Sequence, residues 1–138
     1  MDEFKLISSY FKPLTAESND QLESYQLLSD AASFKAKVGQ QLIFTKDMMV
    51  EGVHYFSDVR PDLLAKKLLR VNLSDLAATG AKPVGYLLGL SLKSIDEKWL
   101  EAFVNGLAED QARVDIAVIG GDTVKIPDTA AQVLSLTA

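Results

Sequence analysis

The sequence contains no cysteine and only one histidine, His54, among its 138 residues. The lack of cysteine excludes disulfides, thiolate zinc sites, iron–sulfur clusters and a cysteine nucleophile. The single histidine excludes a multi-histidine metal site within one chain. Carboxylates are therefore the side chains to examine for metal chemistry.

Basic residues are also few, since 14 stand against 19 acidic ones and the net charge is −5. This balance disfavours non-specific binding to nucleic acids and attraction to anionic membranes. No apolar run approaches the roughly 20 residues that span a bilayer. The first five residues are acidic and do not have the basic and then apolar order of a signal peptide. We therefore expect a cytoplasmic protein without a nucleic-acid or membrane partner.

Several nucleotide-binding motifs are missing as well. The chain has no G-x-x-x-x-G-K-[ST] loop, no dinucleotide G-x-G-x-x-G and no protein-kinase H-R-D or D-F-G motif. Any nucleotide site must therefore be of another kind.

What is present is the composition of an ordinary globular domain, with 48% hydrophobic residues in a chain of single-domain length. Branched and aromatic stretches predict strands, and apolar residues at helical spacing predict helices between them. This order is typical of an α/β or α+β fold, a mixed sheet with helices packed on one face. The other face then needs a second domain or a second copy to cover it. The predicted strands are 41–45, 49–55, 84–92, 114–119 and 131–137, and the predicted helices are 4–11, 61–80 and 94–107.

The helix limits follow from the residues at their ends. Pro13 limits the first helix, and the second begins at Pro61 and ends at Gly80, since proline fits a first turn and glycine a helix end. Ser94-Ile95-Asp96-Glu97 has the form of a capping box at the start of the third helix. The chain stops inside the last predicted strand, so we expect it to be part of a longer protein.

One aspartate, Asp75, continues an apolar stripe of the predicted helix 61–80, at helical spacing from Leu68 and Val71. A carboxylate there is costly to bury unless a cation or several hydrogen-bond donors satisfy it. The alternative is a partly solvated aspartate near a frayed helix end. The spacing alone leaves both interpretations open.

A second aspartate, Asp122, follows two glycines in Gly120-Gly121-Asp122-Thr123, directly after the predicted strand 114–119. Glycines let the backbone approach a ligand closely and present amide donors to phosphate oxygens. Ligands of open α/β sheets collect at the carboxyl ends of such strands. The alternative is a tight turn with aspartate as a turn former.

Asp30 and Asp47 also lie beside apolar residues, and each alone is typical of a turn or a cap. Together the four aspartates have no compensating run of basic residues nearby, and such oxygen ligands suit Mg²⁺ or Mn²⁺ bridging to nucleotide phosphates. We therefore expect the four to converge into one pocket that divalent cations make tolerable. His54 is either a satisfied structural residue or a donor to a ligand.

Three blocks of the sequence carry a resemblance to a known family. Residues 47–56 are DMMVEGVHYF, residues 71–83 are VNLSDLAATGAKP, and residues 119–123 are IGGDT. They are similar to the blocks D-x-L-V-E-G-x-H-F, V-N-L-S-D-L-A-A-M-G-A-x-P and G-G-D-T of the thiamine-monophosphate kinases, in the aminoimidazole-ribotide-synthetase-like superfamily. The resemblance covers essentially the whole chain but only the family's N-terminal, ATP-binding domain.

The resemblance implies direct, in-line transfer of the γ-phosphate of ATP to thiamine monophosphate, assisted by Mg²⁺ and without a phosphoenzyme. It also implies a homodimer in which the sheets of two subunits pair into a barrel, and residues 1–138 as the N-terminal domain of a two-domain protein whose C-terminal domain is absent. By motif position it implies metal ligands at Asp30, Thr45, Asp47, Asp75 and Asp122, ATP contacts at Gly121, Asp122 and Lys125, and a substrate contact at His54.

The chain departs from the family pattern at three places. It has Ser29-Asp30-Ala31 where the family has G-D-D, Lys46 where it has threonine, and Lys125 where it has arginine. Two alternatives stay open: another ATP-using member of the superfamily, or a non-catalytic nucleotide-binding or dimerisation module. We expect little kinase turnover from the 138 residues alone.

Overall fold

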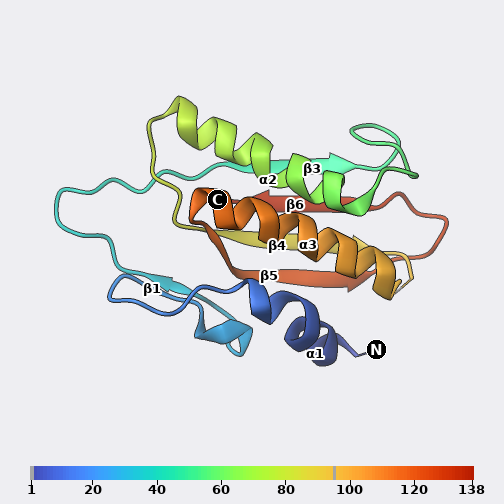
Figure 1. Ribbon diagram of the computed structural model, residues 1–138, viewed down its shortest axis with the longest axis horizontal. Coiled ribbons are helices and arrows are strands. Elements are labelled where there is room, and N and C mark those ends of the chain that lie inside the picture. Colours follow the sequence, from blue (N-terminus) through green and yellow to red (C-terminus); the bar gives the residue numbers. More distant parts are fainter. Residues whose placement is uncertain (1, 95) are drawn as a thin grey trace.

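A computed structural model describes residues 2–94 and 96–138. Its centre is a four-stranded mixed sheet with two long helices on one face (Figure 1). The strand order is β3-β6-β4-β5, with β4 and β5 parallel and the other neighbours antiparallel. This confirms the predicted fold class. The elements are β3 (Lys46–Val50), α2 (Pro61–Ala78), β4 (Gly85–Leu92), α3 (Glu97–Val114), β5 (Ala117–Lys125) and β6 (Val133–Thr137).

The N-terminal part of the chain lies alongside the free edge of β5 (Figure 1). It begins with a short α-helix that continues as a π-helix and then as a 3-10 helix containing Pro13. The helical segment ends there, as proline at that position predicts. A small two-stranded sheet follows. These elements are α1 (Glu3–Leu6), η1 (Ile7–Phe11), η2 (Lys12–Leu14), β1 (Leu22–Glu23), η3 (Tyr25–Leu27) and β2 (Ser33–Phe34).

The helix α2 forms where the sequence predicts it. Pro61 occupies its first turn, and the chain leaves the helix at Gly80, whose φ of 69° is accessible to glycine without strain. Leu64 and Leu68 are fully buried against the sheet, together with much of the same helix face. The local signals of this segment and its tertiary packing therefore agree.

Two predicted strands are wrong in their limits. Residues 41–44 form an exposed loop, Thr45 exchanges two backbone hydrogen bonds of 3.0 Å with Ala138, and β3 begins only at Lys46. The strand predicted at 49–55 ends at Val50, because Gly52 takes a φ of 81° and turns the chain so that its N–H bonds the carbonyl of Tyr55 at 2.8 Å. Apolar composition alone did not provide the pairing that a strand requires.

Two other predicted boundaries also shift. The strand predicted at 114–119 starts at Ala117 and continues to Lys125, so Gly120-Gly121-Asp122-Thr123 lies inside β5 and is not a turn after it. Asp96, and not Ser94, caps α3, since its carboxylate accepts the N–H groups of Lys98 and Trp99. Ile95, the second residue of the expected capping box, lies outside the described residues.

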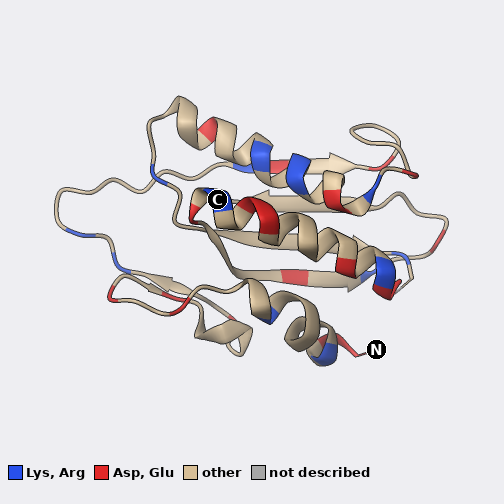
Figure 2. Ribbon diagram, in the orientation of Figure 1, with Lys and Arg blue, Asp and Glu red and all other residues tan. Residues whose placement is uncertain are grey.

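Figure 2 shows charged residues along both α2 and α3, and two ion pairs join these helices. Arg70 of α2 donates to Asp110 of α3 through two hydrogen bonds, of 2.7 and 2.8 Å, and the Asp110 side chain is only 3% exposed. The hydrogen bonds from Arg70 hold the pKa of the Asp110 carboxyl below its usual value, against the burial that raises it. Lys66 and Glu109 form a further ion pair in the same layer.

Removing the Arg70 guanidinium should expose the cost of burying Asp110. We expect Arg70→Met to lower the free energy of unfolding at pH 7 by about 2 kcal/mol, measured by urea denaturation. A carboxyl whose folded pKa is depressed stabilises above its unfolded pKa and loses that contribution as pH falls through the folded value. The difference between variant and wild type should therefore shrink from pH 7 to pH 3. Lys98→Met, on an exposed part of α3, is the matched control, and an equal loss in both variants would contradict the assignment.

The sheet face opposite the helices is not covered by any described element. Side chains alternate along each strand, so Met49 is buried under the helices while Met48 points to the open face and is 53% exposed. One row of residues across the open face consists of Lys46, Thr137, Leu87 and Gly120, and a second row consists of Met48, Ser135, Gly89 and Asp122.

Within residues 2–94 and 96–138, no helix is both long and apolar enough to cross a membrane.

Candidate functional site

The first group of predicted site residues gathers between β3 and the last turn of α2. Thr45 precedes β3, and its hydroxyl donates to the Asp75 carboxylate over 3.0 Å. Asp47 is half-buried and lies on the same side of β3 as the core residue Met49. Asp75 itself is exposed, which agrees with the solvated interpretation and not with a buried carboxylate on the apolar stripe. Thr45 and Asp75 thus meet from segments 30 residues apart, and Asp47 follows two residues after Thr45 on the same side of the strand.

Lys46, which replaces a family threonine, points to the opposite face of β3. Its ammonium donates to Ser135 over 2.6 Å and to Thr137 over 3.3 Å, both on the open sheet face. Because neighbouring residues of a strand face opposite sides, this charge is directed away from Asp47. The departure therefore leaves the candidate oxygen ligands of the first group unchanged.

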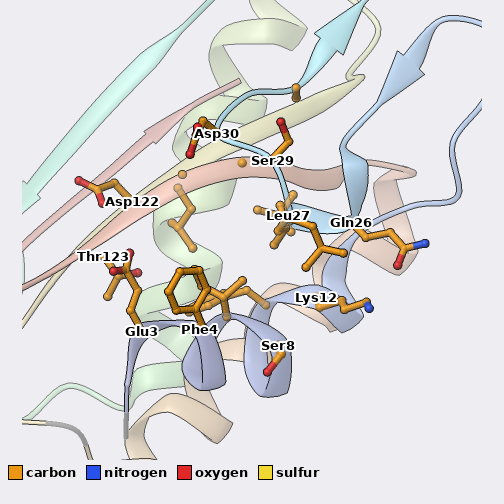
Figure 3. A pocket seen from close by; sticks show the side chains of 18 of the residues that line it. Glu3, Phe4, Ser8, Lys12, Gln26, Leu27, Ser29, Asp30, Asp122 and Thr123 are labelled. Atoms are coloured by element: carbon orange, nitrogen blue, oxygen red, sulfur yellow. The ribbon is translucent and has the colours of Figure 1, made fainter.

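The second group lines a cavity of about 760 Å³ between β5 and the N-terminal segment. Asp30, Gly121 and Asp122 contribute to its wall, and Figure 3 shows the two carboxylates at the same side of the cavity. Gly121 has a φ of 153°, and a Cβ there would lie 1.9 Å from the Leu88 carbonyl oxygen. This glycine is therefore required by the close pairing of β4 and β5, whatever else it does.

The two groups do not converge. β3 and β5 are the opposite edges of the sheet. Along the row that crosses the sheet from Asp47 to Gly121, Leu136 of β6 and Leu88 of β4 lie between them. Three strand spacings of about 4.8 Å separate them by on the order of 14 Å. Among the described residues, no three His, Asp or Glu side chains are close enough to hold one ion. The expected single pocket is thus replaced by two separate sets of oxygen atoms.

The chemistry of both sets suits a divalent cation. The four ion pairs in the described part of the chain use Glu51, Asp62, Glu109 and Asp110, so no lysine or arginine there is paired with the four predicted aspartates. Carboxylate and hydroxyl oxygens without an ammonium partner are the ligands that Mg²⁺ prefers. The residues present therefore fit the metal that the family resemblance implies.

His54 lies in the exposed turn after β3, away from both groups of oxygens. Its Nδ1 accepts the backbone N–H of Val50 over 2.9 Å, so the neutral ring carries its proton on Nε2. Lys67 of α2 donates to the His54 carbonyl over 2.5 Å and ties the turn to the helix. The side chain is thus oriented by its own turn, with one N–H available as a donor.

Lys125 does not line the cavity that holds Gly121 and Asp122. It lies at the end of β5 in the same row as Leu92, on the face opposite to that of Asp122, and it is exposed. An ATP contact at Lys125 would therefore have to involve a part of the ligand that reaches past the strand end.

Sequence reasoning missed a polar cluster that closes the turn after β3. Glu51 pairs with Lys93 at 2.6 Å and accepts the Gln132 backbone N–H at 2.9 Å. The hydrogen bond from Lys93 lowers the pKa of Glu51. The Tyr55 hydroxyl donates to the Gln132 side chain at 3.0 Å, and burial raises its pKa. The only signal in the sequence was Glu51 itself, inside the first family block.

The comparisons with known proteins place the chain in a family. Residues 28–138 match the AIR synthase related protein, N-terminal domain. The match covers most of the chain, so this protein belongs to that family.

Within the family, the chain is similar to thiamine-monophosphate kinases, as the sequence blocks predicted. It is 46% identical to that enzyme from Caulobacter vibrioides over 123 residues, 88% of this chain and 34% of the relative. The crystal structure of the enzyme from Stenotrophomonas maltophilia K279a superposes with a TM-score of 0.76 at 35% identity, over 99% of this chain and 42% of that one. AaThiL complexed with AMPPCP and TMP has a TM-score of 0.67 at 25% identity, over 98% and 40%.

The chain spans about a third of the Caulobacter relative and about two fifths of the solved structures. The similarity therefore concerns one part of those longer proteins.

Proposed function

We propose that the protein to which this chain belongs phosphorylates thiamine monophosphate to thiamine diphosphate with ATP. The observation that carries this proposal is the likeness, in both sequence and fold, to thiamine-monophosphate kinases, one of which is complexed with AMPPCP and TMP. Residues 1–138 would form its N-terminal domain. Phosphoryl transfer requires mainly positioning and charge neutralisation, so the absence of a cysteine nucleophile is no obstacle.

The two groups of oxygen atoms have distinct parts in this proposal. Thr45, Asp47 and Asp75 would hold Mg²⁺ between β3 and α2, and Asp30 with Asp122 would hold it at the cavity beside β5. Because the groups lie at opposite edges of the sheet, they hold separate ions and do not share one. The metal, when bound, supplies charge neutralisation for the polyphosphate.

The remaining predicted residues would position the substrates. Gly121 and Asp122 border the ATP phosphates at the cavity, and Lys125 contributes positive charge near the end of β5. His54 would donate from Nε2 to the thiamine substrate, in a direction fixed by the hydrogen bond between Nδ1 and Val50. The in-line geometry of the transfer depends on both substrates being held in this way.

The test is direct phosphorylation by the longer protein. The full-length protein should form thiamine diphosphate from ATP, Mg²⁺ and thiamine monophosphate, measured by chromatography with fluorescence detection of the oxidised product. Failure to form it under any Mg²⁺ concentration would overturn the proposal. The 138 residues alone should show little turnover, and vigorous turnover by them would contradict the assignment to one domain of two.

We also propose that the open sheet face pairs with the same face of a second copy and forms a barrel-like homodimer. Met48, Leu87 and Val124 expose large apolar surfaces there, between 44% and 53% of each side chain. A sheet of this kind is stabilised when a second layer covers its open face. Apart from Lys46 and Asp122, the two open rows consist of apolar, small and hydroxyl side chains that a twofold copy can meet.

A charge on that face should break the pairing. We expect the chain to sediment as a dimer at micromolar concentration and Met48→Lys to sediment as a monomer with its far-ultraviolet circular dichroism unchanged. Burying an isolated lysine at the centre of the interface costs more than a typical side-chain contact gains. Val38→Lys, on a fully exposed loop, is the control and should remain a dimer. A monomeric wild-type chain would count against the paired sheets.

A further inference from the structure

The turn that follows β3 carries His54 and is held mainly by polar contacts. It lies at the end of the sheet where β3 and β4 end and β6 begins (Figure 1). Val53 and Phe56 on this turn are 75% and 81% exposed, so they bury little apolar surface. Among residues 52–56, only Tyr55 is buried. Hydrogen bonds and charge, more than packing, therefore decide where the His54 side chain points.

Glu51 ties the start of this turn to two other strand ends. Its carboxylate pairs with Lys93, the residue after β4, with oxygen–nitrogen distances of 2.6 and 2.8 Å. It also accepts the backbone N–H of Gln132, the residue before β6, over 2.9 Å. The side chains of Glu51 and Lys93 are 16% and 30% exposed, and a partly buried, charge-assisted pair is stronger than one on an open surface. Glu51 thus fixes the turn relative to β4 and β6.

The far end of the turn is tied to the same place. The Tyr55 hydroxyl donates to the Gln132 side chain over 3.0 Å, and the Tyr55 carbonyl accepts the N–H of Gly52 over 2.8 Å. Between the two ends, the His54 ring is oriented by the Val50 N–H, which its Nδ1 accepts over 2.9 Å. Nε2 is left as the donor, and its direction depends on how the two ends of the turn are held.

We propose that Glu51 and Lys93 are positioning residues, which hold the turn so that the His54 Nε2 proton faces the thiamine substrate. The inference rests on the proposed function, in which His54 is the donor. Lys93 acts without touching the substrate, since its ammonium is engaged by the Glu51 carboxylate. A donor that is held in place before the substrate arrives loses less conformational freedom on binding, so the ion pair acts on substrate affinity.

The main test is Lys93→Met in the full-length protein, which removes the ammonium and keeps the apolar stem. We expect the KM for thiamine monophosphate to rise about 3- to 12-fold, the effect of one hydrogen bond, with kcat and the KM for ATP within about twofold of wild type. Lys93→Arg should restore the KM, because a guanidinium also pairs with a carboxylate. Lys82→Met is the matched control and should behave as wild type, since Lys82 is exposed before the start of β4 and joins none of the four ion pairs found among the described residues.

His54→Ala shows whether Lys93 acts through His54. In the His54→Ala background, Lys93→Met should raise the KM no further, because the donor that it positions is gone. An equal rise of the KM in both backgrounds would mean that Lys93 contacts the substrate itself, and it would overturn the inference. An unchanged KM in Lys93→Met alone would overturn it as well.

Amide hydrogen exchange, followed by mass spectrometry on the same proteins, examines the turn without the reaction. Lys93→Met should speed exchange in residues 50–55 and leave exchange in α3 unchanged, because only local contacts are lost. Wild-type protection of residues 50–55 in Lys93→Met would contradict the inference even if the KM rises. No thiamine diphosphate from the unchanged full-length protein would overturn the proposed function and the substrate role of the turn together, while the exchange result would still show whether the ion pair holds the turn.

Discussion

Asp75→Asn is expected to lower kinase turnover by about two to three orders of magnitude in the full-length protein. The substitution keeps the shape of the side chain and still offers an oxygen to the Thr45 hydroxyl, which donates to Asp75 over 3.0 Å. What it removes is the negative charge that, in the proposed function, would hold a divalent cation beside Thr45 and Asp47. Since Asp75 is exposed, the free energy of unfolding should change little. If Asp75 had only a structural role, the substitution would lower the free energy of unfolding and leave turnover unchanged, which is the opposite of the expected result.

The measurement is steady-state formation of thiamine diphosphate over a range of Mg²⁺ concentrations. A lost ligand should raise the Mg²⁺ concentration for half-maximal turnover as well as lower the maximum. Asp128→Asn makes the same chemical change at an exposed position on the turn before β6 and should be indistinguishable from wild type. If the two variants turn over equally, Asp75 is not a metal ligand.

Gly106→Val should destabilise the fold by about 3 kcal/mol or more, a large fraction of the stability of a domain of this size. Gly106 lies where α3 crosses α2, and a Cβ there would be 2.4 Å from the carbonyl oxygen of Asp62 and 2.8 Å from its Cα. Those are backbone atoms, so the two helices would have to move apart. Helix propensity alone predicts the opposite sign, because valine forms helices better than glycine.

The neighbouring Asn105→Val is the control for Gly106→Val. Asn105 is exposed on the same helix, and asparagine and valine have similar helix propensities, so its free energy of unfolding should stay within about 0.5 kcal/mol of wild type. Urea denaturation of both variants measures the difference. A stability of Gly106→Val equal to that of the control would show that the helices are not held at this separation by the glycine.

The parts of the fold that were predictable are those with local signals. Pro61 and Gly80 delimit α2, and the apolar run through residues 84–92 becomes β4, because helix ends and buried strands are determined within a few residues. Residues 41–45 have the same apolar composition and form no strand. A strand requires a neighbouring backbone, and here the pairing with the last strand begins only at Thr45, which bonds Ala138, and continues through Lys46 and Thr137.

Part of the candidate site followed from the sequence in the same way. The blocks around Asp47, Asp75 and Asp122 predicted the family that the comparisons show. Gly120 and Gly121 were expected in a turn or a phosphate loop, the usual places for glycine, and they lie inside β5 instead. A glycine is needed at position 121 because the backbone of β4 leaves no room for a side chain there. Their position depends on a neighbour 33 residues earlier in the sequence.

The amino-acid sequence by itself determined the family, because its three motif blocks are specific, and the lack of cysteine with a single histidine left carboxylate and hydroxyl oxygens as the main candidate ligands. The tertiary structure alone decided which of those oxygens meet. By inserting β6 and β4 between β3 and β5, it put Asp47 and Asp122 at opposite edges. The reason is physical, since strand order arises from pairings between distant segments whose energies no local pattern contains.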